Sequence, residues 1–111
     1  MIDVSFTHQR VTVQGHAGYA PRGEDIVCAA VSALVYALIG TLEEDGLIRE
    51  LVVRPGFVTV AAKKDHKAFD VVRCGIAQIA ARYPQCVSVR GKKQRDIRGK
   101  AYPPHKRQKA E

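Results

Sequence analysis

One histidine and one cysteine stand on either side of a short segment near the start of the chain. His16 ends the alternating run VTVQGH, Cys28 lies just inside an apolar run, and residues 17–24, AGYAPRGE, separate them. An imidazole beside a thiol can carry out nucleophilic catalysis, because the imidazole takes the thiol proton and later returns it to a leaving group. The alternative is that both residues are ordinary. A single cysteine in an apolar helix is commonly part of the core, and a histidine at a strand end is commonly a surface residue.

The predicted secondary structure gives Cys28 a special position. Asp25 is a good N-cap for a helix over residues 26–44, which makes Cys28 the third helical residue. Free N–H groups and the positive end of the helix dipole favour a thiolate there. The same N–H groups, including that of Cys28, offer an oxyanion hole. This chemistry requires the end of strand 11–16 to lie beside the helix start, which a short loop permits.

Other residues near the pair have two interpretations each. Asp25 either orients the site or only caps the helix. Ser32 lies four residues after Cys28 on the same helical face. It contacts the sulfur or substrate, or else its hydroxyl bonds back to the Cys28 carbonyl. The loop 17–24 has two glycines and a proline, so it is predicted to be exposed and mobile. Tyr19 in this loop either touches substrate or is a plain surface tyrosine.

Hydrophobic periodicity along the chain predicts seven elements in the order ββαββαβ. The expected strands cover residues 1–7, 11–16, 47–53, 57–62 and 86–89, and the expected helices cover residues 26–44 and 66–82. Asp65 is predicted to cap the second helix. The order favours an α+β fold, with two helices packed on a mostly antiparallel sheet of about five strands. The first helix is apolar nearly all round, which places it in a core or an interface.

Several classes of protein are disfavoured by composition. The longest apolar stretch, residues 26–42, is at the short limit for a membrane span and is flanked by acids, so we expect a buried helix and no membrane association. The N-terminus lacks the pattern of a signal peptide. Three widely spaced cysteines fit a reducing, cytoplasmic setting, with Cys74 and Cys86 as structural thiols. The sequence contains no metal-ligand spacing and no phosphate-binding glycine motif, so we expect neither a metal nor another cofactor.

The net charge of +7 belongs to the end of the chain. Residues 1–89 contain nine basic and nine acidic residues, whereas residues 90–111 contain nine basic and two acidic ones. We therefore expect a single domain over residues 1–89 and a flexible basic tail over residues 90–111. Such a tail attracts phosphate in a salt-dependent way. One alternative is thus a non-catalytic, ribosome- or RNA-associated binding protein that acts through this tail.

The stretch GHAGYAPRGEDIVCAAVSAL, residues 15–34, resembles the signature of the ribosomal-processing cysteine protease family, Prp. That signature reads G-H-A, a variable loop containing glycine, G-x-D-I-V-C-A, and an S-A pair. The positions that fit it are Gly15, His16, Ala17, Gly23, Asp25, Ile26, Val27, Cys28, Ala29, Ser32 and Ala33. The resemblance continues into AARYPQCVSV and so covers residues 1–89, as one cysteine protease domain. The basic tail lies beyond it.

The resemblance implies a cytoplasmic, homodimeric cysteine endopeptidase. It implies that the substrate is the precursor of bacterial large-subunit ribosomal protein number twenty-seven, whose N-terminal extension is removed. Cys28 then matches the nucleophile and His16 the general base and acid, with Asp25 and Ser32 in support. The loop that contains Gly18, Tyr19 and Gly23 resembles a flap over the site. Contact of residues 90–111 with ribosomal RNA would hold such a protease near its substrate.

Overall fold

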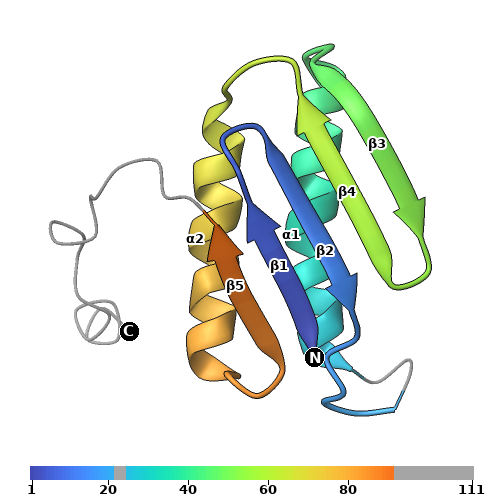
Figure 1. Cartoon of the computed structure of the whole chain (residues 1–111), viewed down its shortest axis with the longest axis vertical. Coiled ribbons are helices and arrows are strands. Elements are labelled where there is room, and N and C mark those ends of the chain that lie inside the picture. The colour runs from blue at the N-terminus through green and yellow to red at the C-terminus, as the bar shows by residue number, and fades with distance from the viewer. Residues whose placement is uncertain (22–24, 92–111) are drawn as a thin grey trace, which may run out of the picture.

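The computed structural model describes residues 1–21 and 25–91 and has the predicted order of elements. Figure 1 shows the order ββαββαβ along the chain. The strands are β1 (Ile2–Phe6), β2 (Arg10–Gly15), β3 (Ile48–Arg54), β4 (Phe57–Ala62) and β5 (Val87–Gly91), and the helices are α1 (Ile26–Glu44) and α2 (Lys67–Arg82). The α+β prediction is confirmed. The last strand runs to Gly91, two residues beyond the predicted end.

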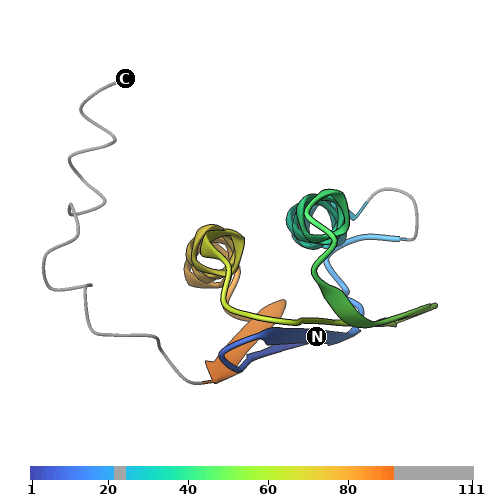
Figure 2. The ribbon, with the colours of Figure 1, turned by 90° about the horizontal axis from the view of Figure 1, so that it is seen from above.

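The five strands form one sheet in the spatial order β3-β4-β2-β1-β5. Each neighbouring pair is antiparallel except β1 and β5, which are parallel. Both helices lie on the same face of the sheet, and the other face is open (Figure 2). A parallel pair needs a crossover connection. Helix α2, which connects β4 to β5, carries the chain across the sheet so that β5 runs parallel to β1.

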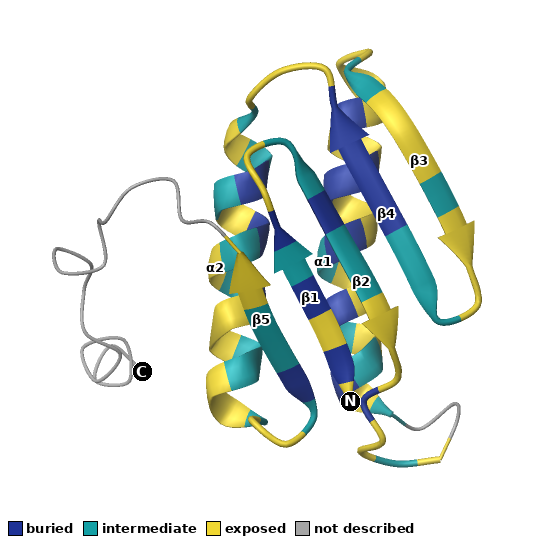
Figure 3. Cartoon of the chain, viewed as in Figure 1, coloured by how far each residue is buried: buried dark blue, intermediate teal, exposed yellow. Residues whose placement is uncertain are grey.

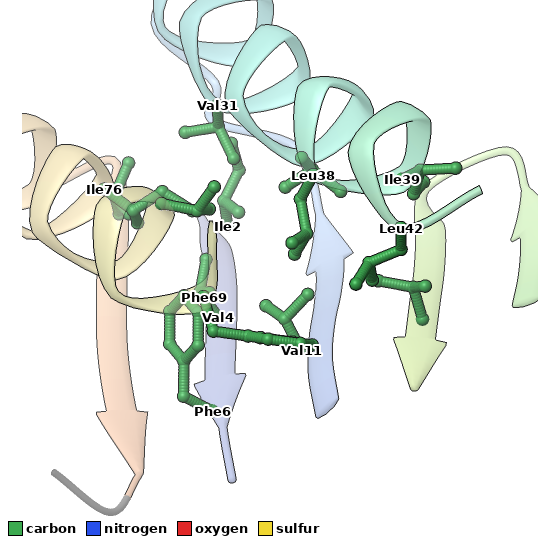
Figure 4. Close-up of a cluster of buried hydrophobic side chains, with 14 of the residues drawn as sticks. Ile2, Val4, Phe6, Val11, Val31, Leu38, Ile39, Leu42, Phe69 and Ile76 are labelled. Carbon is green, nitrogen blue, oxygen red and sulfur yellow. The ribbon is translucent and has the colours of Figure 1, made fainter. Parts of the chain in front are cut away.

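The core lies between the two helices and the sheet (Figure 4). The sheet residues that point to the helices alternate along each strand, as a half-buried sheet requires. The buried side chains are Ile2, Val4, Phe6, Val11, Val60, Ala62 and Val87 from the sheet, Val27, Val31, Val35, Leu38, Ile39 and Leu42 from α1, and Phe69, Val72 and Ile76 from α2. The opposite side of α1 stays exposed, with Ile26 and Tyr36 at 56% and 50% exposure. Buried and exposed segments alternate along both helices (Figure 3). By length and composition α1 is apolar enough to cross a membrane, but one side of it forms this core.

The predicted cap of the second helix is wrong by one residue. His66, not Asp65, is the N-cap of α2, and its Nδ1 accepts the N–H of Ala68 at 3.0 Å. Its Nε2 lies 2.9 Å from an Asp45 carboxylate oxygen at the end of α1. Asp65 instead accepts a hydrogen bond from the Gln9 amide, at 3.0 Å. The carboxylate is a better cap by local preference, but the contact of the second ring nitrogen with Asp45, 21 residues away in the sequence, favours the histidine.

Candidate active site

Asp25 caps α1, as the sequence predicts. Its backbone is extended, and Oδ1 accepts the N–H groups of Val27 at 3.0 Å and Cys28 at 2.9 Å. The other oxygen, Oδ2, accepts the N–H of Tyr19 at 3.1 Å. The bond from the Cys28 N–H is the main cause that lowers the pKa of the Asp25 carboxyl below its ordinary 3.8, and the N–H groups of Tyr19, Ala20 and Val27 add to it against partial desolvation. The carboxylate therefore joins the helix start to the preceding loop.

Cys28 is the third residue of α1 and is half-buried. Its Sγ accepts a hydrogen bond from the N–H of Ala17 at 3.2 Å. Ala17 is only 4% exposed, so the prediction of an exposed loop is wrong for its first residue. The reason is this contact, which packs the end of the β2 connection onto the thiol. The end of β2 and the start of α1 therefore lie side by side, as the proposed chemistry requires.

His16 directly precedes Ala17, but its ring points elsewhere. The imidazole is exposed and lies over the β3–β4 turn, where a Cβ added to Gly56 would be 3.2 Å from Nε2. The Gly15 N–H donates to the Gly56 carbonyl at 2.9 Å, which fixes the backbone before His16 to the same turn. Within residues 1–21 and 25–91, no hydrogen bond joins the His16 ring to Cys28. The structure thus brings the two backbones together and leaves the ring turned away.

Gly15 is required where β2 ends. It has φ +95°, and a Cβ there would meet the Met1 carbonyl oxygen at 2.3 Å. A left-handed φ and a contact of this kind both exclude a side chain. The glycine of the G-H-A stretch therefore lets the chain turn against β1 and so sets the position of His16.

The described part of the predicted flap is attached at two points. Gly18 and Tyr19 are exposed, as predicted, and Gly23 lies outside the described residues. The Tyr19 N–H reaches Asp25, and the Tyr19 ring packs edge-to-face on Tyr83, with centroids 5.5 Å apart and planes at 81°. Tyr83 is the C-cap of α2. The sequence gives no reason to connect Tyr83 to the site, because both helices and the hairpin between them separate Tyr83 from Tyr19 along the chain.

The remaining candidates stand apart from the sulfur. Ser32 is on the exposed side of α1, and no described residue hydrogen-bonds its hydroxyl, so neither the Cys28 carbonyl nor Sγ holds it. Cys74 is exposed on α2, and Cys86 is half-buried against the core. All three cysteines are free thiols.

Comparison with known proteins defines the class of the molecule. Residues 1–88, which contain both helices and four complete strands, match a family model of cysteine proteases. The description of that family is Cysteine protease Prp, and the chain belongs to it. The resemblance found in residues 15–34 is therefore confirmed, and the protein is a member of a cysteine peptidase family.

Two relatives from mycoplasmas are named Ribosomal processing cysteine protease Prp. The protein of Mycoplasma pneumoniae (strain ATCC 29342 / M129 / Subtype 1) is 30% identical over 92 residues, which covers 79% of this chain and 92% of the relative. The protein of Mycoplasma genitalium (strain ATCC 33530 / DSM 19775 / NCTC 10195 / G37) is 27% identical over 95 residues, which covers 80% and 94%. This chain therefore spans nearly the full length of both relatives.

Solved structures share the fold. The essential ribosomal processing protease Prp of S. aureus, crystallised with a covalently linked product peptide, superposes with a TM-score of 0.74 at 20% identity, over 83% of this chain and all of that one. SMU.848 from Streptococcus mutans superposes with a TM-score of 0.67 at 26% identity, over 85% and 96%. At 20% identity, the similarity to the S. aureus structure shows that the two chains share a fold.

Proposed function

We propose that the protein is an endopeptidase that removes the N-terminal extension of large-subunit ribosomal protein number twenty-seven, with Cys28 as nucleophile and His16 as general base and acid. The observation that carries the proposal is the 3.2 Å hydrogen bond from Ala17, the residue after His16, to the Cys28 sulfur at the start of α1. Family membership supports the peptidase class, and the names of the mycoplasma relatives support ribosomal processing.

The reaction begins when the His16 ring turns from Gly56 toward the sulfur. The imidazole takes the Cys28 proton, the sulfur attacks the peptide carbonyl carbon, and the imidazolium returns the proton to the leaving amine as the C–N bond breaks. Water then hydrolyses the thioester with His16 again as base. A ring that is turned away in the free enzyme is compatible with this role, because catalytic hydrogen bonds often tighten only when substrate binds.

The oxyanion donors differ from those expected from sequence. The N–H of Cys28 is occupied by Asp25 at 2.9 Å, so it is not available in this conformation. The N–H of Ala17 already points at the sulfur, and a tetrahedral intermediate on Sγ would place its oxygen close to that donor. We therefore assign Ala17 as a main-chain donor to the oxyanion.

The test uses a synthetic peptide that spans the precursor junction, with products identified by mass spectrometry. Wild-type protein should cut at one bond, Cys28→Ala should not cut, and His16→Ala should lose at least about 100-fold in kcat/KM, the usual size of an acid–base contribution. Matched controls are Cys74→Ala and His8→Ala, since Cys74 and His8 are exposed and lie outside the site. Cleavage by Cys28→Ala would refute the mechanism.

If the peptide is not cut, a second measurement shows whether the proposed substrate or the proposed active site is wrong. Iodoacetamide labelling followed by peptide mapping gives a rate for each cysteine without any substrate. We expect Cys28 to react faster than the exposed Cys74, because the Ala17 N–H and the start of α1 stabilise negative charge on its attacking sulfur. Fast labelling of Cys28 without cleavage would support Cys28 as the reactive cysteine and would reject the precursor peptide as the substrate.

For assembly and location we propose a cytoplasmic homodimer in which the exposed apolar side of α1 is covered by the second copy. Charge supports a further proposal, that residues 90–111 contact ribosomal RNA, since they hold nine basic and two acidic residues. Ending the chain after Gly91 should weaken retention on RNA at low salt and leave peptide cleavage unchanged. Equal retention of the shortened chain would reject the RNA contact.

A further inference from the structure

The Tyr83 ring lies where it can fix the position of Tyr19 in the loop beside the Cys28 thiol. Its ring contacts the Tyr19 ring in an edge-to-face arrangement with centroids 5.5 Å apart. The two residues are far apart in sequence, since Tyr19 follows β2 and Tyr83 ends α2. This contact therefore ties the loop to an element that the proposed mechanism does not use.

The Tyr83 side of the contact is firmly held. Its N–H donates to the Ile79 carbonyl at 2.8 Å, as the C-cap of α2. Its own carbonyl accepts the N–H groups of Cys86 at 2.9 Å and Val87 at 3.1 Å. The side chain is half-buried and packs against the core. The backbone of Tyr83 is thus fixed to both α2 and β5, and its ring is a stable surface for a partner.

The Tyr19 side is connected to the sulfur by short steps. The Tyr19 N–H donates to Asp25 Oδ2 at 3.1 Å, and Oδ1 of the same carboxylate holds the Cys28 N–H at 2.9 Å. Two residues earlier, the Ala17 N–H meets the Cys28 Sγ at 3.2 Å. A shift of Tyr19 therefore acts on both contacts at Cys28, one through Asp25 and one through the chain to Ala17.

We infer that Tyr83 is a positioning residue of the active site: its ring holds Tyr19, and through Tyr19 it keeps the Ala17 amide on the Cys28 sulfur. This inference rests on the proposed function for its role in catalysis, but the positioning itself does not depend on the substrate. The relevant part of Tyr83 is the ring, because no described residue hydrogen-bonds the hydroxyl. An aromatic pair of this geometry corresponds to roughly a 2- to 10-fold change in an equilibrium constant.

The first test is labelling of the free enzyme with iodoacetamide, mapped cysteine by cysteine. Tyr83→Ala should lower the Cys28 rate about 2- to 10-fold, because the Ala17 N–H then leaves the sulfur for part of the time and no longer stabilises negative charge on it. Tyr83→Phe should match wild type. Tyr19→Ala should give the same fall, and the double variant Tyr19→Ala/Tyr83→Ala should add nothing further, as expected for two residues that act through one contact.

Cys86 supplies the internal control for folding. It is half-buried, and its N–H donates to the Tyr83 carbonyl, so a loosened end of α2 would raise the labelling rate of Cys86. Slower Cys28 labelling with an unchanged Cys86 rate supports positioning. A rise at Cys86, a faster Cys28 rate, or a Cys28 rate that neither Tyr83→Ala nor Tyr19→Ala changes would overturn the inference. The labelling rates do not depend on whether the enzyme cuts the precursor peptide.

If the peptide is cut, kinetics give a second measure. The loop contact is made before substrate arrives, and bound substrate can restore the loop position. Tyr83→Ala should therefore raise KM about 2- to 10-fold and leave kcat nearly unchanged, with Tyr83→Phe restoring the wild-type KM. A fall in kcat with an unchanged KM would contradict this order of events.

Discussion

At the residue scale, the Asp25 carboxylate serves the helix with one oxygen and the loop with the other. Oδ1 accepts from Val27 and Cys28, and Oδ2 accepts from Tyr19. Asparagine caps helices as well as aspartate does, but its NH₂ group would face the Tyr19 N–H. We expect Asp25→Asn to keep the circular dichroism of α1 and to speed hydrogen exchange of the Tyr19 amide roughly 10- to 100-fold, the usual weight of a hydrogen bond to a charged group. Unchanged exchange at Tyr19 would contradict a role of Oδ2 in holding the loop.

The same carboxylate predicts a dependence on pH. The folded-state pKa of Asp25 lies below its ordinary 3.8, chiefly because the Cys28 N–H binds the ionised form. Its stabilising contribution is therefore complete above the ordinary pKa and is lost as the pH falls through the lowered value. The stability difference between wild type and Asp25→Asn, measured by urea denaturation, should shrink across that acid range. A difference that stays constant from neutral pH to the most acid conditions would refute the assignment.

At the scale of the elements, one imidazole links the end of α1 to the start of α2. His66 Nδ1 accepts the Ala68 N–H, and Nε2 contacts Asp45, the C-cap of α1. Loss of an N-cap costs about 1 kcal/mol. His66→Ala should lower the free energy of unfolding by at least that amount in urea, whereas His66→Asn should recover the cap but not the reach to Asp45. Equal stabilities of all three proteins would mean that neither contact contributes.

At the scale of the whole molecule, the uncovered side of α1 is the surface on which the proposed dimer would form. Ile26 and Tyr36 are 56% and 50% exposed on a helix that has no charged residue before Glu43. A symmetric second copy can cover such a surface. Sedimentation should show a dimer for wild type and a monomer for Tyr36→Lys. The control Gln14→Lys puts the same charge on an exposed residue of β2, and it should stay dimeric. A monomeric wild type at micromolar concentration would reject the dimer.

Local patterns predicted most of this molecule, and long-range contacts supplied the rest. The order of elements and the cap at Asp25 follow from periodicity and side-chain chemistry within a few residues. The parallel pairing of β1 with β5 does not, because it depends on a crossover through α2. The His66 cap and the Tyr19 ring against Tyr83 also depend on residues distant in sequence. The orientation of the His16 ring depends on Gly56, a residue in the turn of the neighbouring β3–β4 hairpin.

The parallel strand β5 has a consequence for how the enzyme can be attached to something else. Its first residue, Val87, pairs with Ile2 at the end of β1 that also pairs with Gly15, whereas its last residue, Gly91, pairs with Phe6 at the other end. Four residue steps at about 3.3 Å each separate these ends by roughly 13 Å. The chain therefore leaves the sheet on the side remote from Cys28. A partner or an immobilising surface joined through this exit can be held while the thiol faces away from it, open to an incoming peptide.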